Sequence, residues 1–209
     1  MANTYTKAAF TLTVTIEEAA MLRAAEQAVD ILDSNGDDAD LALGYDSLGT
    51  RFHSLFPPKG ASRFENFLAL FDDWIFPYLD CRIDITEPDD AGNCRATFWG
   101  DQFGIEPVAG LIRIVCKSAL PCGFAWISDC DRMRPGEFGG GCVLITEAGL
   151  TFHSTQNILD RAARNITQFS RGIYCDKLPR PEESHVADSA MSLGLSQEAG
   201  SVARTREGK

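Results

Sequence analysis

The chain begins with an alternation of apolar and polar residues that predicts a strand. Within residues 10–14 every second residue is apolar and the residues between them are threonines, so one face of the strand is apolar. Apolar residues then recur every three or four positions as far as Leu32, which is the period of an amphipathic helix. Thr15 followed three positions later by Glu18 is a capping-box pattern at the start of that helix. The beginning of the chain therefore predicts a strand followed by a helix.

A polar and acidic stretch comes next. Its alternation of Asp33, Asn35 and Asp37 is also found in calcium-binding loops. However, the sixth position of such a loop is glycine and here is Asp38, and the twelfth is glutamate and here is Gly44. We therefore expect a solvated acidic loop and no calcium.

An aromatic segment follows that has helical spacing. Ser62 and Glu65 repeat the capping-box pattern, and large apolar residues recur at intervals of three and four up to Phe76. Pro77 is expected to end this element. The pattern predicts a helix over Phe64–Phe76 whose aromatic stripe belongs to the core.

The rest of the chain alternates between strand-like and helical patterns. The strand-like segments are residues 81–86, 94–99, 124–128, 142–146 and 150–155. A polar turn joins the first two, a long hairpin loop over 129–141 joins the next two, and Pro107 opens a helix between the pairs. A short helix begins at Asn157. Hairpin-linked strands with intervening helices predict an α+β fold with helices packed on an antiparallel sheet.

The domain organisation follows from composition. We expect a single α+β globular domain over residues 1–175, with two subdomains, 1–80 and 81–175, as the alternative. Residues 176–209 are rich in Ser, Glu, Ala, Gly and Pro, which is typical of a polar, mobile C-terminal tail.

Charge and cysteine usage narrow the classes of function. Residues 1–128 carry 19 acidic and nine basic side chains, a net charge of −10 out of −11 for the chain. Direct binding to nucleic acid is disfavoured, because phosphate contacts need clustered Lys and Arg. No apolar run is long enough for a membrane span and no secretory signal pattern is visible, so a cytoplasmic location is expected. Seven cysteines, an odd number, predict reduced thiols.

The stretch CDRMRPGEFGGGC, residues 130–142, invites a ligand-binding interpretation. No lysine follows its glycines and no helix is expected to begin there, so neither a Walker loop nor a dinucleotide fingerprint is present. No Cys-x₂₋₄-Cys pair favours zinc, although a site assembled only in three dimensions stays an alternative. Arg132 and Arg134 are candidate anion-binding residues, and the alternative is that they pair with the protein's own acids.

Catalytic residues do not emerge from the sequence. The three histidines are far apart, and no cysteine is marked as activated. Asp129 and Asp131 are paired carboxylates of a type that can perform acid–base chemistry, but carboxylates on a polar loop are usually solvated. We expect a protein that is not an enzyme and that needs no cofactor and no metal.

Part of the chain resembles proteins of mobile genetic elements. Ala96-Thr-Phe-Trp-Gly100, a helix, Phe124-Ala-Trp126 and Pro135-Gly-Glu-Phe-Gly139 resemble small ferredoxin-like proteins carried on plasmids and phages. The opening TKAAFTLTVTIEEA is similar to acidic accessory proteins of integrative elements. The element pattern over Cys94–Thr155 is itself β-α-β-β, as in half or more of a ferredoxin-like fold. The resemblance implies a role in countering host defence, for which anti-CRISPR proteins are a prominent class. It carries no functional residues over.

The leading hypothesis is a non-catalytic inhibitor that works through its acidic surface as a nucleic-acid mimic. Carboxylates can occupy the Lys/Arg track that a host nucleic-acid-binding defence complex reserves for phosphates, and ordinary solubility is the alternative explanation. The predicted partner-binding residues are Asp30, Asp33, Asp37, Asp38, Asp40, Asp46, Asp72, Asp73, Asp89 and Asp90. The protein is expected to be a monomer or homodimer in the host cytosol.

Two other hypotheses stay open. One is a small-molecule enzyme with a site near the 129–141 loop. The other is an oligomeric accessory protein whose exposed aromatic residues around Phe52, Phe56 and Trp74 form an interface.

Overall fold

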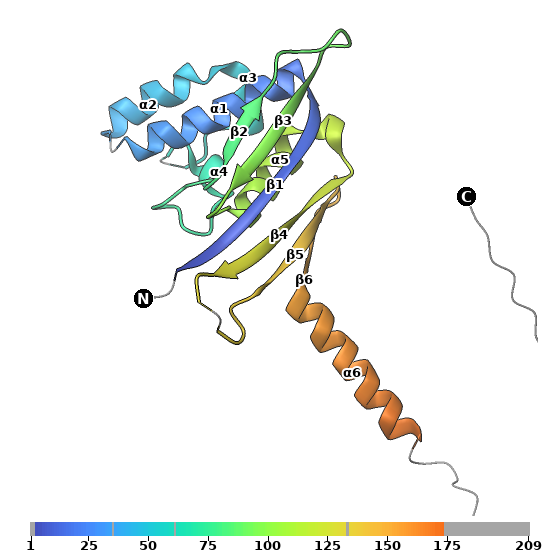
Figure 1. Cartoon of the computed structure of the whole chain (residues 1–209). Helices are drawn as coiled ribbons and strands as arrows, with labels where there is room; N and C mark the ends of the chain where they lie inside the picture. Colours follow the sequence, from blue (N-terminus) through green and yellow to red (C-terminus); the bar gives the residue numbers. More distant parts are fainter. Residues whose placement is uncertain (1–2, 35, 61, 133, 174–209) are drawn as a thin grey trace, which may run out of the picture. The chain divides into compact units, whose positions relative to one another are not determined.

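A computed structural model describes residues 3–34, 36–60, 62–132 and 134–173 (Figure 1). Contacts divide the chain into two units, residues 1–168 and residues 169–209. The described part of the second unit is the end of the last helix. Residues 176–209, predicted to be a mobile tail, lie outside the described residues.

Six strands form a single antiparallel sheet in the order β2-β3-β1-β4-β5-β6. The strands are β1 (Thr4–Thr15), β2 (Arg82–Ile85), β3 (Asn93–Gly100), β4 (Cys122–Cys130), β5 (Gly139–Ile145) and β6 (Leu150–Ser154). Both predicted hairpins, β2–β3 and β4–β5, are present. Together with the helices that pack on the sheet, this confirms the predicted α+β class.

The long strand β1 holds the two halves of the sheet together. Its residues 8–15 pair with β3, and its residues 4–7 pair with β4. The predicted β-α-β-β section exists as β3, α5 (Ile105–Val115), β4 and β5, but β1 lies between β3 and β4. The ferredoxin-like arrangement therefore starts at β1, since the strand order β2-β3-β1-β4 with a helix after β1 and after β3 is that of a split β-α-β fold.

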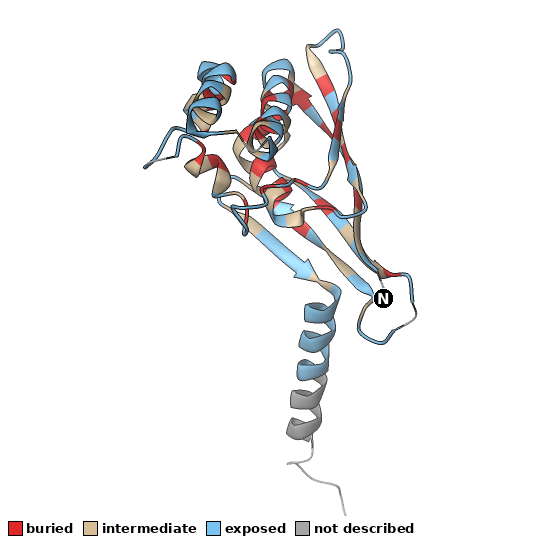
Figure 2. Ribbon diagram, turned by 90° about the vertical axis from the view of Figure 1, so that its left-hand side faces the viewer, coloured by how far each residue is buried: buried red, intermediate tan, exposed pale blue. Residues whose placement is uncertain are grey.

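Helices α1 (Ile16–Asp33) and α5 cover one face of the sheet. Alternate residues on the strands are buried, among them Val14, Ala96, Phe98 and Val143. Figure 2 shows buried segments on the strands beside the helices. The predicted inward face of α5, which includes Val108 and Ile112, is fully buried. Phe10 stacks between Phe98 and Phe124 at ring-centroid distances of 5.0 and 4.4 Å, so aromatic packing joins both halves of the sheet.

The capping box predicted for α1 is confirmed. The Thr15 hydroxyl accepts a hydrogen bond from the Glu18 backbone N–H at 3.2 Å, and the Glu18 carboxylate accepts one from the Thr15 N–H at 3.0 Å. The same carboxylate also accepts the Ser118 backbone N–H at 2.7 Å. Glu18 is 8% exposed, so a buried acid links the start of α1 to the short 3₁₀ turn η1 (Lys117–Ala119) that follows α5.

The prediction of an acidic loop was wrong, because most of this stretch forms helix α2 (Asp38–Ser47). Asp37 caps this helix by accepting the backbone N–H groups of Ala39 and Asp40. Acidic side chains in the first turn also interact favourably with the helix dipole. The aspartates that were expected to form a loop therefore stabilise the start of a helix. Tyr45 supplies its buried side. The short helix α3 (Gly49–Leu55) follows.

The predicted helix over Phe64–Phe76 was also wrong in extent. Helix α4 covers only Glu65–Leu68. After it, backbone hydrogen bonds join residues three apart instead of four, so the α-helix does not continue. The Asp73 side chain accepts the Ile75 backbone N–H, which competes with continuing the helix. As a result the stripe divides: its first part is core, whereas Trp74 is 68% exposed.

The aromatic interface predicted around Phe52, Phe56 and Trp74 needs the same correction. Phe52 and Phe56 are completely buried and contact each other, with ring centroids 5.1 Å apart. Both rings also pack against Phe67 of α4. They belong to the core that α3 and α4 share, so only Trp74 is available on the surface.

Candidate functional site

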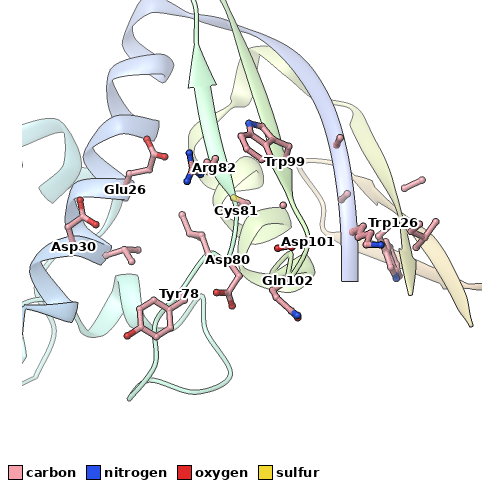
Figure 3. A pocket seen from close by; sticks show the side chains of 18 residues that line it. Glu26, Asp30, Tyr78, Asp80, Cys81, Arg82, Trp99, Asp101, Gln102 and Trp126 are labelled. Carbon is pink, nitrogen blue, oxygen red and sulfur yellow. The ribbon is translucent and has the colours of Figure 1, made fainter. Parts of the chain in front are cut away.

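A wide groove of about 1330 Å³ lies beside the end of α1 and includes strand residues, such as Trp99, that alternate with the buried ones. Its lining comes from α1, from the segment that enters β2, from the end of β3 and from facing parts of β1 and β4. Figure 3 shows Glu26 and Asp30 on α1, with Trp99 and Trp126 on the strands across from them. Small-molecule pockets usually measure 300–1,000 Å³, so the size suits a peptide segment better than a metabolite.

Four carboxylates line this groove: Glu26, Asp30, Asp80 and Asp101. Burial raises the pKa of Glu26, and the nearby Asp30 and Asp84 raise it further, while the Ile83 backbone N–H, which bonds to the carboxylate, lowers it. Partial burial likewise raises the pKa of Asp80. Both pKa shifts mean that the negative charge is poorly solvated here, so a cation entering the groove would gain more than on open surface.

Asp80 is held in place by unusual backbone geometry. Its φ of 50° lies in the left-handed region, which non-glycine residues rarely adopt. The chain passes so close to Gly100 that a Cβ there would lie 2.6 Å from the Asp80 carbonyl oxygen. A glycine at position 100 is thus required for the segment carrying Asp80 to reach the groove.

Trp99 provides a flat apolar surface beside these acids. Its indole N–H donates to Asp84 Oδ2 at 2.6 Å, and the Arg82 guanidinium carbon lies 5.4 Å from the ring centroid. The indole is thereby fixed from two sides while its residue is still 41% exposed. Aromatic faces attract Lys and Arg side chains through cation–π interactions, so Trp99 complements the carboxylates.

The two basic residues of the groove are both engaged. Lys7 Nζ lies 2.7 Å from Asp129 Oδ2. This hydrogen bond raises the pKa of Lys7 and lowers that of Asp129. Arg82 lies against Trp99. Contact with a neutral ring leaves Arg82 charged, so the lining carries four carboxylates against two cations and is acidic on balance.

The groove contains one cysteine, Cys81. Burial raises its pKa to about 12, so the thiol is neutral at physiological pH and a poor nucleophile. Burial also raises the pKa of Cys116. None of the six described cysteines is in a disulfide, in line with the predicted reduced state.

The predicted partner-binding acids are all exposed, and those near the end of α1 have specific local contacts. Asp30 lines the groove, and Asp33 accepts a hydrogen bond from Tyr78, which also lines it. Asp37 caps α2, and Asp38 and Asp40 lie in its first turn. At the other end of α2, Asp46 pairs with Arg63.

The remaining predicted acids lie elsewhere. Asp72 and Asp73 are on the exposed segment after α4. Asp89 and Asp90 are in the β2–β3 turn, next to the beginning of α1, since a Cβ on Gly92 would lie 3.9 Å from Ile16. The 18 residues of α1 span about 27 Å, so this turn is remote from the groove end of the helix.

The glycine-rich loop does not contribute to the groove. Arg134 Nη1 lies 3.5 Å from Glu137, and Arg132 is exposed, and neither arginine lines the groove. The Cys130 thiol donates to Glu137 at 2.7 Å, and this bond raises the pKa of Cys130. Arg134 thus contacts one of the protein's own acids, and the anion-binding prediction for the two arginines stays a prediction.

Sequence reasoning missed Glu26, Asp80, Trp99 and Asp101 as site residues. The sequence did contain one indication for Trp99. Side chains alternate along a strand, and residues 94, 96 and 98 are the buried set, so Trp99 belongs to the outer face of the sheet. The convergence of the carboxylates depends on tertiary structure and has no local pattern.

Among the described residues, no three His, Cys, Asp or Glu side chains are grouped in a way that would hold a metal ion. Nor does any helix in the described ranges have the length and apolar character to cross a membrane. No family model, curated protein or solved structure matches this chain.

Proposed function

We propose that this protein is a non-catalytic binding protein whose acidic groove receives a Lys/Arg-rich segment of a partner protein. The observation that carries the proposal is that four carboxylates, two with pKa values raised by burial, line one groove together with Trp99, a residue that is 41% exposed. Cationic side chains would relieve the poorly solvated charge and lie on the indole at the same time.

Acidic residues outside the groove also support a basic partner. Asp33, Asp37, Asp38 and Asp40 extend the acidic surface from the end of α1 to the start of α2. A surface of one sign accelerates the encounter with a partner of the opposite sign and selects against acidic partners. The partner class is therefore basic protein surface and not nucleic acid.

The more specific form of the proposal is an inhibitor from a mobile genetic element that acts in the host cytosol. There the carboxylates would occupy positions that a nucleic-acid-binding defence complex reserves for phosphates, as an anti-CRISPR protein of the mimic type does. Part of the predicted acid set, including Asp37 and Asp89, also stabilises local structure, so mimicry rests mainly on the groove.

Affinity capture from a bacterial lysate tests the proposal. The groove variant combines Asp30→Asn, Asp80→Asn and Asp101→Asn. A matched control with Glu17→Gln, Glu87→Gln and Glu147→Gln removes three exposed carboxylates that neither line the groove nor belong to the predicted partner-binding set.

We expect the wild-type protein and the control to retain a nucleic-acid-binding protein at low salt and to release it at high salt. The groove variant should retain little of it. Equal losses in the two variants would show that net charge alone is responsible and would refute the role of the groove.

A further inference from the structure

Strand β6 leaves one edge of the sheet open. It pairs with β5, and within the described ranges nothing pairs with its other side. Its residues Thr151, Phe152 and His153 are exposed. The strand LTFHS contains no lysine, no acid and no proline, the residues with which proteins usually protect a sheet edge.

The opposite edge of the sheet, strand β2, is protected against pairing with another strand. On β2, Arg82 and Asp84 are charged and exposed. The Glu26 side chain of α1 accepts the backbone N–H of Ile83. A partner strand would have to displace this contact, whereas nothing comparable covers β6 among the described residues.

Helix α6 (Thr155–Ile173) starts directly after β6 and has an uncovered apolar side. Every described side chain from Thr155 to Asn165 is exposed, with Ile158 at 56% and Leu159 at 63% (Figure 2). Ala162 continues the apolar stripe one turn later. Isolated helices are marginal in water and gain most of their stability from packing an apolar face, so α6 needs a partner surface.

We propose that this surface is an interface between two copies of the chain. The two β6 strands pair antiparallel about a two-fold axis through Phe152, and the apolar side of each α6 packs on the other copy. Centring the axis on the third residue of a five-residue strand pairs all five residues of both strands, with Thr151 opposite His153 of the second copy. This interface is independent of the acidic groove.

Charge favours a second copy as the occupant. The chain has a net charge of −11, yet residues 150–165 contain one acid, Asp160, and two bases, Arg161 and Arg164. This region can therefore approach its own copy without the repulsion that two acidic surfaces would experience, and no like charges oppose each other across the paired β6 strands. A two-fold interface is also the commonest way in which soluble proteins form oligomers.

Sedimentation equilibrium of the full chain, with a monomer mass of 22.8 kDa, tests the dimer. The wild-type protein should sediment as a dimer at micromolar concentrations. Leu159→Glu places a charge in the interface and should weaken dimerisation at least about tenfold. Leu43→Glu is the matched control, since Leu43 is 70% exposed on α2, away from the proposed interface, and should leave the dimer intact.

Disulfide cross-linking tests the register in a Cys142→Ser, Cys175→Ser background, because Cys142 is exposed next to β6 and Cys175 lies outside the described residues. Residues opposite each other across an antiparallel pair are within disulfide reach, so Phe152→Cys should cross-link to its own counterpart. Thr151→Cys has its counterpart two positions away and should cross-link about tenfold more slowly.

A wild-type monomer would overturn the proposal, whether β6 is then free or covered by residues 174–209 of the same chain. So would a dimer that Leu159→Glu and Leu43→Glu weaken equally, or one in which Thr151→Cys cross-links as fast as Phe152→Cys.

Discussion

Replacing Glu18 by glutamine would show how strongly the start of α1 is attached to the turn after α5. The Glu18 carboxylate accepts hydrogen bonds from the backbone N–H groups of Thr15, at 3.0 Å, and Ser118, at 2.7 Å, and from the Ser118 hydroxyl. A glutamine side chain has one acceptor oxygen, so one of the two backbone N–H groups would face an amide donor. A buried hydrogen bond to a charged group contributes about 1.5–3 kcal/mol. We expect the free energy of unfolding to fall by about 2–4 kcal/mol.

Urea denaturation followed by circular dichroism measures this loss, with Glu17→Gln as the matched control. Glu17 lies in the same first turn but is exposed, so its replacement removes only a favourable interaction with the helix dipole, worth about 0.5 kcal/mol. Similar losses in the two variants, within about 0.5 kcal/mol, would refute the view that Glu18 joins the two segments.

Three further changes test separate parts of the structure. Gly44→Ala would put a Cβ 2.6 Å from Ile31 Cγ2 and should lower stability by about 1–3 kcal/mol in thermal unfolding, and an unchanged melting temperature would contradict the close approach of α2 to α1. Tyr45→Phe removes a buried 2.7 Å hydrogen bond to the Phe56 carbonyl oxygen and should cost about 1–2 kcal/mol in urea unfolding, whereas no loss would mean that the carbonyl finds another donor. Glu26→Gln addresses a carboxyl whose pKa is raised in the folded state, so wild-type stability is fully present at low pH and declines as pH rises through that pKa. The glutamine variant lacks this decline and should be the more stable protein at neutral pH, by less than about 1 kcal/mol because the group is only half buried, and parallel stability–pH curves would exclude the mechanism.

Local patterns predicted the elements that have local causes. The capping box of Thr15 and Glu18, the apolar face of α5 and both hairpins follow from residues close in sequence. Helices α2 and α4 were predicted wrongly, because each sequence pattern is compatible with two structures. Asp37 suits a loop and a helix cap equally, and the stripe beginning at Phe64 keeps helical spacing beyond the point where the Asp73 side chain competes for the backbone.

The groove could not be predicted from the sequence, for a different reason. Its carboxylates come together through the pairing of β1 with β3, the packing of α1 on the sheet and the close approach of the Asp80 backbone to Gly100. None of these contacts joins neighbours in sequence. Only the outward position of Trp99 was predictable, because strand alternation assigns faces without knowledge of the partner strands.

The salt dependence of binding to a defined basic peptide tests the central claim most directly. The probe is a short Lys/Arg-rich peptide, and its dissociation constant is measured by calorimetry at several salt concentrations for the wild-type protein and for the Asp30→Asn, Asp80→Asn, Asp101→Asn variant. We predict that wild-type affinity falls steeply with salt, and that the variant binds about tenfold more weakly at low salt with a shallower slope. Affinity that is insensitive to salt, or identical in both proteins, would contradict the proposal that the groove binds through its carboxylates.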